Sequence, residues 1–283
     1  MGPAMATLAH ITDLHLRPPG ILTLGRIDAD RFAARAIDRI IAAHPDIDAV
    51  IVSGDLADIG EADAYSRAAM LLSRFSVPVL VVPGNHDRTG PLIAEFVAWP
   101  GVSTRPLADK LCYAVEVDGV RVVMLDTSVD GMDRREQHGL LGDAQLAWLD
   151  ETLGDDVPTL IAMHHPPFPV GIGFMDGITL RDADAFAAVV ARHTSVKRIV
   201  CGHVHRTIVS EVGGVPTIAV PGVAHQVQLA LDAEAPARLV MEPPAYAIHL
   251  VGEGQTISHI GYVDDFGEPE AFADLKRETE PAQ

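Results

Sequence analysis

The stretch "VVPGNHDRTG", residues 81 to 90, changes character halfway along its length. It starts as an apolar, β-branched run of the kind found in buried strands and continues into Gly84, Asn85, His86 and Asp87. Glycine permits a tight backbone turn, and the three residues after it carry an amide, an imidazole and a carboxylate. The stretch therefore predicts a buried strand whose end presents side chains that can bind metals or move protons.

The same transition from an apolar run to polar side chains occurs four more times. The runs are "TLAHITD" (7–13), followed by His15; "AVIVSGD" (49–55); "TLIAMHH" (159–165); and "RIVCGH" (198–203), followed by His205. Each group alone has a plain interpretation, because a solvated loop, a turn or a core histidine also follows many strands. Since ligands bind at the carboxyl ends of strands in α/β sheets, the five runs together predict one shared site.

The order of predicted elements indicates an α/β fold. Apolar residues recur at helical spacing over 28–44, and further helices are predicted at about 61–75, 91–98, 143–153 and 182–193. Hairpins are predicted around Asp118-Gly119 and Gly213-Gly214 and over 247–263. Apolar strands that alternate with helices imply parallel pairing. We therefore expect a four-layer αββα sandwich of two mixed β-sheets flanked by helices, with a small C-terminal β-hairpin or cap.

The composition limits the partners that the chain can have. With 283 residues, of which 48% are hydrophobic, it can bury a substantial core, and it lacks an uncharged apolar run of about 18 residues. Met1 to Leu8 has no features of a signal peptide, so we expect a cytoplasmic protein without membrane insertion. A formal charge of −18 disfavours a long nucleic acid as partner, whereas a small phosphorylated substrate needs only local positive charge.

The predicted site offers nitrogen and oxygen ligands without sulfur. Cys112 and Cys201 are too sparse for a disulfide framework or a thiolate zinc site, and we expect buried reduced thiols. Imidazole, amide and carboxylate ligands suit Zn, Fe, Mn or Co in mixed geometry. Aspartate can bind two ions through its two oxygens, and Asp55, in the middle of the order, is the natural bridge.

The five polar groups stand as "DLH", "SGDLAD", "PGNHD", "MHHPP" and "CGHVH". Over about residues 8–230 this pattern resembles the calcineurin-like metallophosphoesterase superfamily, whose blocks run D-x-H, G-D, G-N-H-[DE], H and G-H-x-H. Within it the chain looks most similar to the bacterial class III cyclic nucleotide phosphodiesterases and the related glycerophosphodiesterases. The resemblance implies a catalytic domain at 1–230, followed at 231–283 by a cap or oligomerisation hairpin and a polar tail.

The resemblance also implies the roles of individual residues. Two divalent transition-metal ions (Fe, Mn, Zn or Co) share Asp55, with Asp13, His15, Asp55 and His205 holding one ion and Asp55, Asn85, His164 and His203 the other. A metal-bound hydroxide attacks phosphorus directly, without a serine or cysteine nucleophile. His86 is expected to be catalytic, donating to a phosphate oxygen or to the leaving oxygen, and His225 is expected to bind substrate together with Asn85 and His86.

Other polar residues near the motifs have two interpretations each. Asp87 either orients a ligand or loop or caps the helix at 91–98, and His165 either supports a metal ligand or packs in the core. His10, in the first strand, is expected to have a structural or supporting role rather than to bind metal. Arg17 and Arg26 form either a rim for the substrate or ordinary loop charges.

The expected activity is hydrolysis of small phosphodiesters, either 3′,5′-cyclic nucleotides or glycerophosphodiesters. The alternatives are a phosphomonoesterase, a nuclease or a protein phosphatase of the same fold, and, with less support, a non-catalytic metal-bound scaffold. The choice between the diesters depends on a cap predicted at 17–28 and 225–265, where aromatic residues for base stacking are scarce: Tyr246, Tyr262 and Phe266. That scarcity favours a small alcohol or a promiscuous site. The resemblance also implies a homo-oligomer, formed through the C-terminal hairpin.

Overall fold

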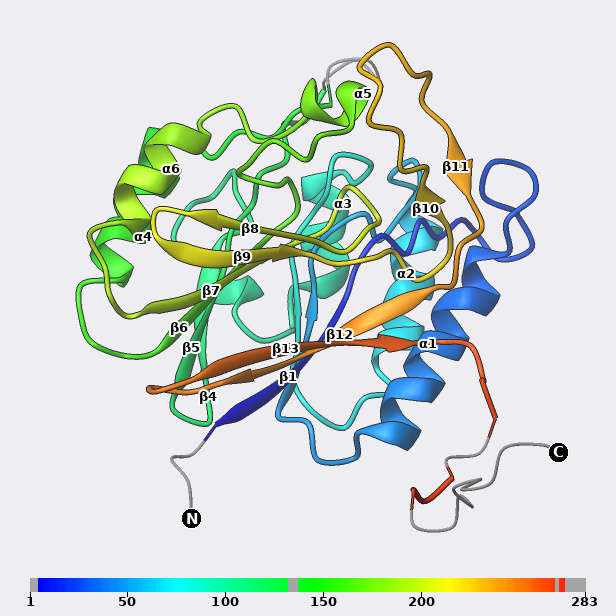
Figure 1. Cartoon of the computed structure of the whole chain (residues 1–283), viewed down its shortest axis with the longest axis horizontal. Helices are drawn as coiled ribbons and strands as arrows, with labels where there is room; N and C mark the ends of the chain where they lie inside the picture. Colours follow the sequence, from blue (N-terminus) through cyan, green and yellow to red (C-terminus); the bar gives the residue numbers. More distant parts are fainter. Residues whose placement is uncertain (1–4, 132–136, 268–269, 273–283) are drawn as a thin grey trace, which may run out of the picture.

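The computed structural model describes residues 5–131, 137–267 and 270–272, which form two β-sheets packed face to face with helices outside (Figure 1). The first sheet has the strand order β13-β12-β1-β2-β3. Its strands are β1 Ala6–Ile11, β2 Ala49–Val52, β3 Val79–Val81, β12 Ala245–Val251 and β13 Thr256–Tyr262. The strands β1, β2 and β3 run parallel, and β12 pairs antiparallel with both β1 and β13.

The second sheet has the strand order β4-β5-β6-β7-β9-β8. Its strands are β4 Tyr113–Val117, β5 Val120–Met124, β6 Thr159–Met163, β7 Val196–Cys201, β8 Ile208–Val212 and β9 Val215–Ala219. The four central strands run parallel, and β4 and β8 are antiparallel strands at the two edges. Both sheets are therefore mixed, as the sequence predicts.

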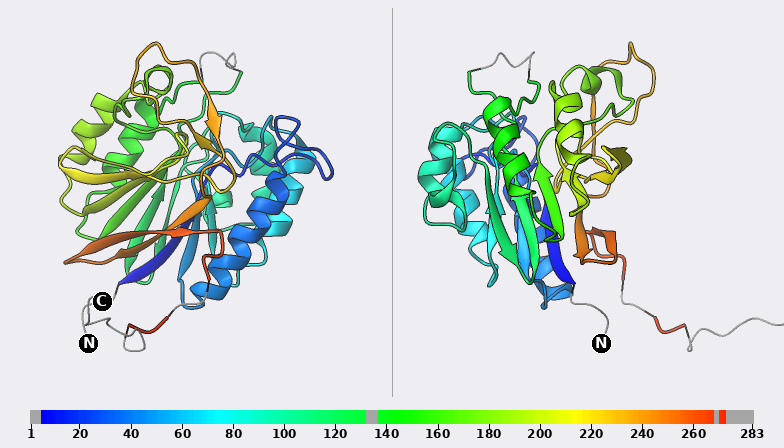
Figure 2. Two further views of the ribbon diagram at one scale, coloured as in Figure 1. Left: turned by 45° about the vertical axis from the view of Figure 1, so that its right-hand side comes forward. Right: turned by 90° about the vertical axis from the view of Figure 1, so that its left-hand side faces the viewer.

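Helices cover the outer face of each sheet, as the right-hand view in Figure 2 shows. The first sheet is covered by α1 Ala29–Ala43, α2 Ala62–Leu72 and α3 Thr89–Phe96, and the second by α4 Asp143–Thr152 and α6 Ala183–Val190. Short elements are the 3₁₀-helix η1 Val102–Thr104, the helix α5 Gly173–Asp176 and the ribbon strands β10 Gln226–Val227 and β11 Leu239–Val240. The predicted four-layer sandwich is confirmed. Among the described residues, no helix has the length and apolar character that a membrane span requires.

Two apolar cores hold the layers together. One contains Ile37 of α1, Val50 of β2 and Val122 of β5, so it joins the first helix layer to both sheets. The other contains Leu149 of α4 and Ile161 of β6, between the second sheet and its helices. Because the strands β2 and β6 are buried along their whole length, neither alternates between apolar and polar residues: β2 is apolar throughout, and β6 is apolar after Thr159.

The predicted hairpins are present. Asp118 and Gly119 both have positive φ, 44° and 76°, as the two central residues of a tight turn between antiparallel strands require. The C-terminal hairpin β12–β13 also forms, and it joins the first sheet because β12 pairs with β1 from Ala6↔Val251 to His10↔Ala247. The hairpin predicted at 247–263 is thus part of the first sheet, because backbone pairing joins it to the first strand of the chain.

Candidate metal centre and substrate pocket

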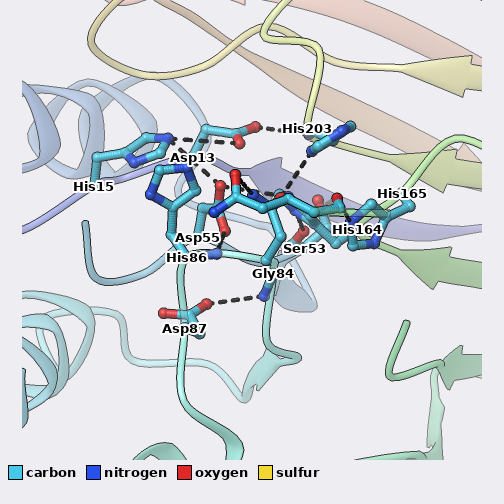
Figure 3. A network of polar contacts seen from close by, with 12 residues as sticks. Asp13, His15, Ser53, Asp55, Gly84, His86, Asp87, His164, His165 and His203 are labelled. Atoms are coloured by element: carbon cyan, nitrogen blue, oxygen red, sulfur yellow. Dashed lines mark hydrogen bonds and ion pairs between the residues drawn. The ribbon is translucent and has the colours of Figure 1, made fainter. Parts of the chain in front are cut away.

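Five strand ends meet at one place, at the carboxyl edges of both sheets (Figure 3). The residues brought together are Asp13 and His15 after β1, Asp55 after β2, Asn85 and His86 after β3, His164 after β6, and His203 and His205 after β7. Parallel strands align their carboxyl ends, and packing the two sheets face to face places both sets of ends beside each other. All the residues that the sequence predicts as metal ligands lie in this one cluster.

One group of donor atoms lies around His15. Its Nε2 atom is 3.2 Å from Nε2 of His205 and 3.6 Å from Oδ2 of Asp55. Nε2 of His205 is in turn 3.1 Å from Oδ1 of Asp13. Ligands bound about 2.0–2.2 Å from a zinc-type ion are about 3.0–3.5 Å from one another, so these atoms have the spacing of a coordination shell.

A second group of donor atoms lies around Asn85. Its Oδ1 atom is 3.0 Å from Nε2 of His164 and 2.9 Å from Nδ1 of His203. Nε2 of His164 is also 3.4 Å from Oδ2 of Asp55. The same oxygen of Asp55 therefore faces both groups, which is the position of a bridging ligand.

The hydrogen bonds behind these rings determine which nitrogen faces the centre. His205 donates from Nδ1 to the carbonyl of His225 at 2.7 Å, and His164 donates from Nδ1 to the carbonyl of Ser53 at 2.8 Å. In each neutral ring the Nε2 lone pair then points at carboxylate or amide oxygens. A metal ion bound between these nitrogens and oxygens would be coordinated by all of them, so the donor set fits a metal centre.

The charges of the cluster lead to the same conclusion. Burial disfavours a positive charge on His164, yet Asp55 raises the pKa of His164 to about 9. Burial likewise opposes ionisation of Asp55 and Asp13, but the surrounding imidazoles hold the pKa of both carboxyls below its ordinary range. The buried carboxylates thus favour a positive charge at the positions that face them, which a metal ion supplies without a proton.

The backbone at the cluster is strained. Five residues there have φ between 46° and 69°, a region that residues other than glycine rarely adopt: Asp13, His15, Asp55, His203 and His205. Each such residue costs about 1–3 kcal/mol, and such strain is concentrated at functional sites. Gly84 is required for a different reason, because a Cβ atom there would collide with the Asp55 carboxylate.

Asp58 supports two residues of the cluster and was not identified from the sequence. Its Oδ1 atom is 3.3 Å from Nδ1 of His15, and its backbone carbonyl accepts a 2.7 Å hydrogen bond from Nδ1 of His86. A carboxylate behind a ligand histidine fixes the orientation of the ring and raises its basicity. Asp58 is the last residue of the motif "SGDLAD", but the sequence alone does not indicate a role for this second aspartate of the motif. Arg17, 3.6 Å from Asp58, forms an ion pair with Glu61 at 2.7 Å.

The contacts of Asp87 and His165 show what each side chain does in the structure. The Asp87 carboxylate accepts hydrogen bonds from the backbone N–H groups of Leu56, Ala57 and Gly84, so it joins the loops after β2 and β3. The helix-cap interpretation is wrong, because α3 starts at Thr89 without a side-chain cap. His165 contacts Thr127 and the Gln137 carbonyl through its two ring nitrogens, and its ring lies against His203.

His10 lies in the interior of the protein, whereas His225 lies beside the cluster. The buried ring of His10 contacts His249 through Nδ1 and Ser53 through Nε2, so both nitrogens are used inside the protein. The ring of His225 lies 5.2 Å from that of His15 and 4.7 Å from that of His205, and its buried Nδ1 has no partner among the described residues.

A pocket of about 340 Å³ opens over the cluster. His15, Asp55, Asn85, His86, His203, His205 and His225 form its polar floor. Its wall is formed by residues from three segments: Leu24; Phe174, Met175 and Ile178 in and after α5; and Val227, Ala237, Arg238 and Leu239 at the β10–β11 ribbon. The lining includes neither Arg17 nor Arg26, and Arg26 is exposed.

None of the three aromatic residues of the predicted cap lines the substrate pocket. Tyr246 is buried in β12 and its hydroxyl contacts His44, whereas Tyr262 and Phe266 line a different cavity. The aromatic residue of the substrate pocket is Phe174. It was missed because α5 is a helix of four residues in a Gly- and Pro-rich stretch, with no periodic pattern that connects it to the site.

Comparison with known proteins identifies relatives of this chain. A family profile described as calcineurin-like phosphoesterase matches residues 6–207. The chain is 37% identical over 253 residues to a "probable cyclic nucleotide phosphodiesterase" of Rhodopseudomonas palustris, covering 88% of this chain and 89% of the relative. It is 30% identical over 275 residues to a "probable glycerophosphodiester phosphodiesterase" of Arcobacter nitrofigilis, covering 96% and 98%. The fold is similar to that of a dimetal phosphatase from Danio rerio, with TM-score 0.63, 16% identity, and 90% and 98% of the chains covered.

Proposed function

The chain belongs to the calcineurin-like phosphoesterase family, and on this premise we propose that it hydrolyses small phosphodiesters at two divalent metal ions. The relatives are named as phosphodiesterases of cyclic nucleotides and of glycerophosphodiesters, two substrates that present the same kind of phosphate. The pocket of about 340 Å³ has the size for one small molecule, which fits either class.

The observation that carries the proposal is the position of Asp55. Its Oδ2 atom lies 3.6 Å from Nε2 of His15 and 3.4 Å from Nε2 of His164, which belong to the two groups of donor atoms. We assign Asp13, His15, Asp55 and His205 to one ion and Asp55, Asn85, His164 and His203 to the other. Mixed nitrogen and oxygen ligands without sulfur suit Fe, Mn, Zn or Co.

Two bound divalent ions would activate a water molecule and neutralise phosphate charge. The protein's own residues orient this chemistry. Ser53 and His225 accept hydrogen bonds from the ligand imidazoles and keep their lone pairs directed inward. Asp58 orients His15, and Gln137 accepts a 3.0 Å hydrogen bond from the Asn85 amide nitrogen, which leaves the amide oxygen directed at the histidines.

His86 is positioned for proton transfer to the substrate. Its Nδ1 donates to the Asp58 carbonyl, so its Nε2 is the nitrogen available to the pocket that it lines. When protonated, Nε2 can donate to a phosphate oxygen or to the departing oxygen. About a third of its side chain is exposed, so it can exchange protons with solvent.

The test is a comparison of a diester with a monoester. Metal-reconstituted protein is expected to hydrolyse bis(p-nitrophenyl) phosphate with a higher kcat than p-nitrophenyl phosphate. The dianionic monoester binds tightly to two cations in the ground state, and tight ground-state binding does not accelerate the chemical step. A clear preference for the monoester would instead favour a phosphomonoesterase. The homo-oligomer and the cytoplasmic location stay predictions, and light scattering of the purified protein tests the first.

A further inference from the structure

The wall of the substrate pocket has a chemistry that differs from its floor. The floor consists of polar side chains at the candidate metal centre, whereas the wall is mainly apolar: Leu24, Phe174, Met175, Ile178, Val227 and Leu239. A glycerol or ethanolamine group is small and hydrophilic and would gain little from such a wall. The wall instead fits a substrate whose non-phosphate part has an apolar face.

Two segments far apart in the sequence form this wall together. The helix α5 and the loop between β10 and β11 lie against each other above the carboxyl edge of the sheets (Figure 1). Their contact is close, because a Cβ atom at Gly173 would collide with the backbone of Ala233. Phe174 follows that contact directly and is packed against the second core, together with Ile178 and Val227. The ring is therefore held in place by its packing on the second core, next to the contact between the two segments.

We propose that Phe174 is a specificity-determining residue that stacks on the nucleobase of a nucleotide substrate, an inference that rests on the proposed function. Every nucleobase has a flat face that stacks on aromatic side chains, and the apolar residues of the wall exclude water around it. Among the described residues, Arg238 is the one arginine that lines this pocket, and its N–H groups match the acceptor atoms on the edge of a purine. An aromatic ring together with an arginine would favour a nucleobase over a purely apolar group, because only the base has polar atoms on its edge.

The substitution that tests this is Phe174→Ala. Removing one stacked aromatic is expected to lower kcat/KM for 3′,5′-cyclic AMP about 5- to 150-fold, mainly through KM. Hydrolysis of glycerophosphoethanolamine, which has no ring, is expected to stay within about twofold. Phe174→Tyr keeps the flat ring and should retain the wild-type values. Phe266→Ala is the matched control, because this exposed phenylalanine lines another cavity.

Phe174 is partly buried, so Phe174→Leu provides a second variant that keeps apolar volume without a flat ring. It should lose nearly as much as Phe174→Ala. Wild-type activity of Phe174→Leu on cyclic AMP, or an equal loss of Phe174→Ala on both substrates, would overturn the stacking role.

Binding provides a readout that does not depend on turnover. Calorimetry of AMP with the metal-reconstituted protein is expected to show a similar 5- to 150-fold loss of affinity for Phe174→Ala. Failure of the wild type to hydrolyse any diester would refute the proposed function, and the AMP measurement would still decide the role of Phe174. Equal AMP affinity of wild type and Phe174→Ala, or no AMP binding by the wild type, would refute that role.

Discussion

His15 and His205 are separated by 190 positions in the sequence, and their Nε2 atoms lie 3.2 Å apart. One follows a strand of the first sheet and the other a strand of the second, so this contact joins the two halves of the sandwich. Nδ1 of His15 faces Asp58, and Nδ1 of His205 donates to a backbone carbonyl. Both Nε2 atoms therefore point into the centre beside the Asp13 and Asp55 carboxylates, and a cation bound between them would remove the repulsion between their lone pairs.

Metal should therefore stabilise the fold. Saturating Mn²⁺ at about 100 times its dissociation constant contributes about 2.7 kcal/mol, which corresponds to a rise in Tm of about 5 °C for a chain of this size. Calorimetric scans with Mn²⁺ and with a chelator measure the difference. Asp55→Ala should abolish most of the rise, and an equal rise in that variant would indicate binding elsewhere.

Asp55→Ala and Asn85→Ala should have different consequences. Asp55 faces both groups of donor atoms, so its loss is expected to remove activity almost entirely. Asn85 faces only His164 and His203, and a neutral amide is a weak ligand, so excess Mn²⁺ should partly restore Asn85→Ala. Initial rates measured over a titration with Mn²⁺ compare the two variants. Equal losses with no rescue would contradict the assignment.

Asp58→Ala should lower kcat about 10- to 100-fold, because His15 loses the carboxylate that orients its ring. Asp58→Asn keeps a short polar side chain whose amide oxygen can still accept a hydrogen bond from Nδ1 of His15, and it should be less affected. Both variants keep the backbone carbonyl that holds His86. Metal content by elemental analysis and the pH profile of kcat separate a positioning role from misfolding. The exposed Asp63 of α2 is the control, since Asp63→Ala should leave kcat unchanged.

His86→Ala should affect substrates with poor leaving groups most. If His86 protonates the departing oxygen, the variant should lose about 10²- to 10⁴-fold on alkyl diesters and far less on p-nitrophenyl diesters. Its metal content should not change, because His86 is not an assigned ligand. Rates over a series of leaving groups measure this. A uniform loss across the series would leave His86 only an electrostatic role on the phosphate.

The buried His10 should make the fold less stable in acid. Burial lowers its pKa to about 3, although Asp13 acts in the opposite direction, whereas an unfolded histidine titrates near 6.5. The unfolded state therefore takes up a proton first as the pH falls below 6.5, and stability is lost from there toward pH 3. His10→Gln should remove about 2 kcal/mol of the difference in unfolding free energy between pH 7.5 and pH 5, measured with denaturant. The exposed His259 is the control: His259→Gln should keep the wild-type difference.

Much of the fold follows from local patterns in the sequence. The helix predicted at 28–44 is observed as α1 Ala29–Ala43, because the Asp28 side chain caps its first turn and its apolar face has helical spacing. The Asp118-Gly119 turn is observed as well, since few residues adopt its two positive φ values. These features depend on interactions between neighbouring residues, which the sequence records directly.

The sequence by itself determined which residues end the strands, and therefore which side chains meet at the carboxyl edges of the sheets. Only the tertiary structure decided their distances, the nitrogen that each ring presents, the support from Asp58 and the place of Phe174 in the pocket wall. Parallel strands bring their ends together whatever the loops contain, so residue type and order suffice for that step. Hydrogen bonds from His205 to His225, and the contact of Gly173 with Ala233, depend on how distant segments pack, and no local pattern encodes them.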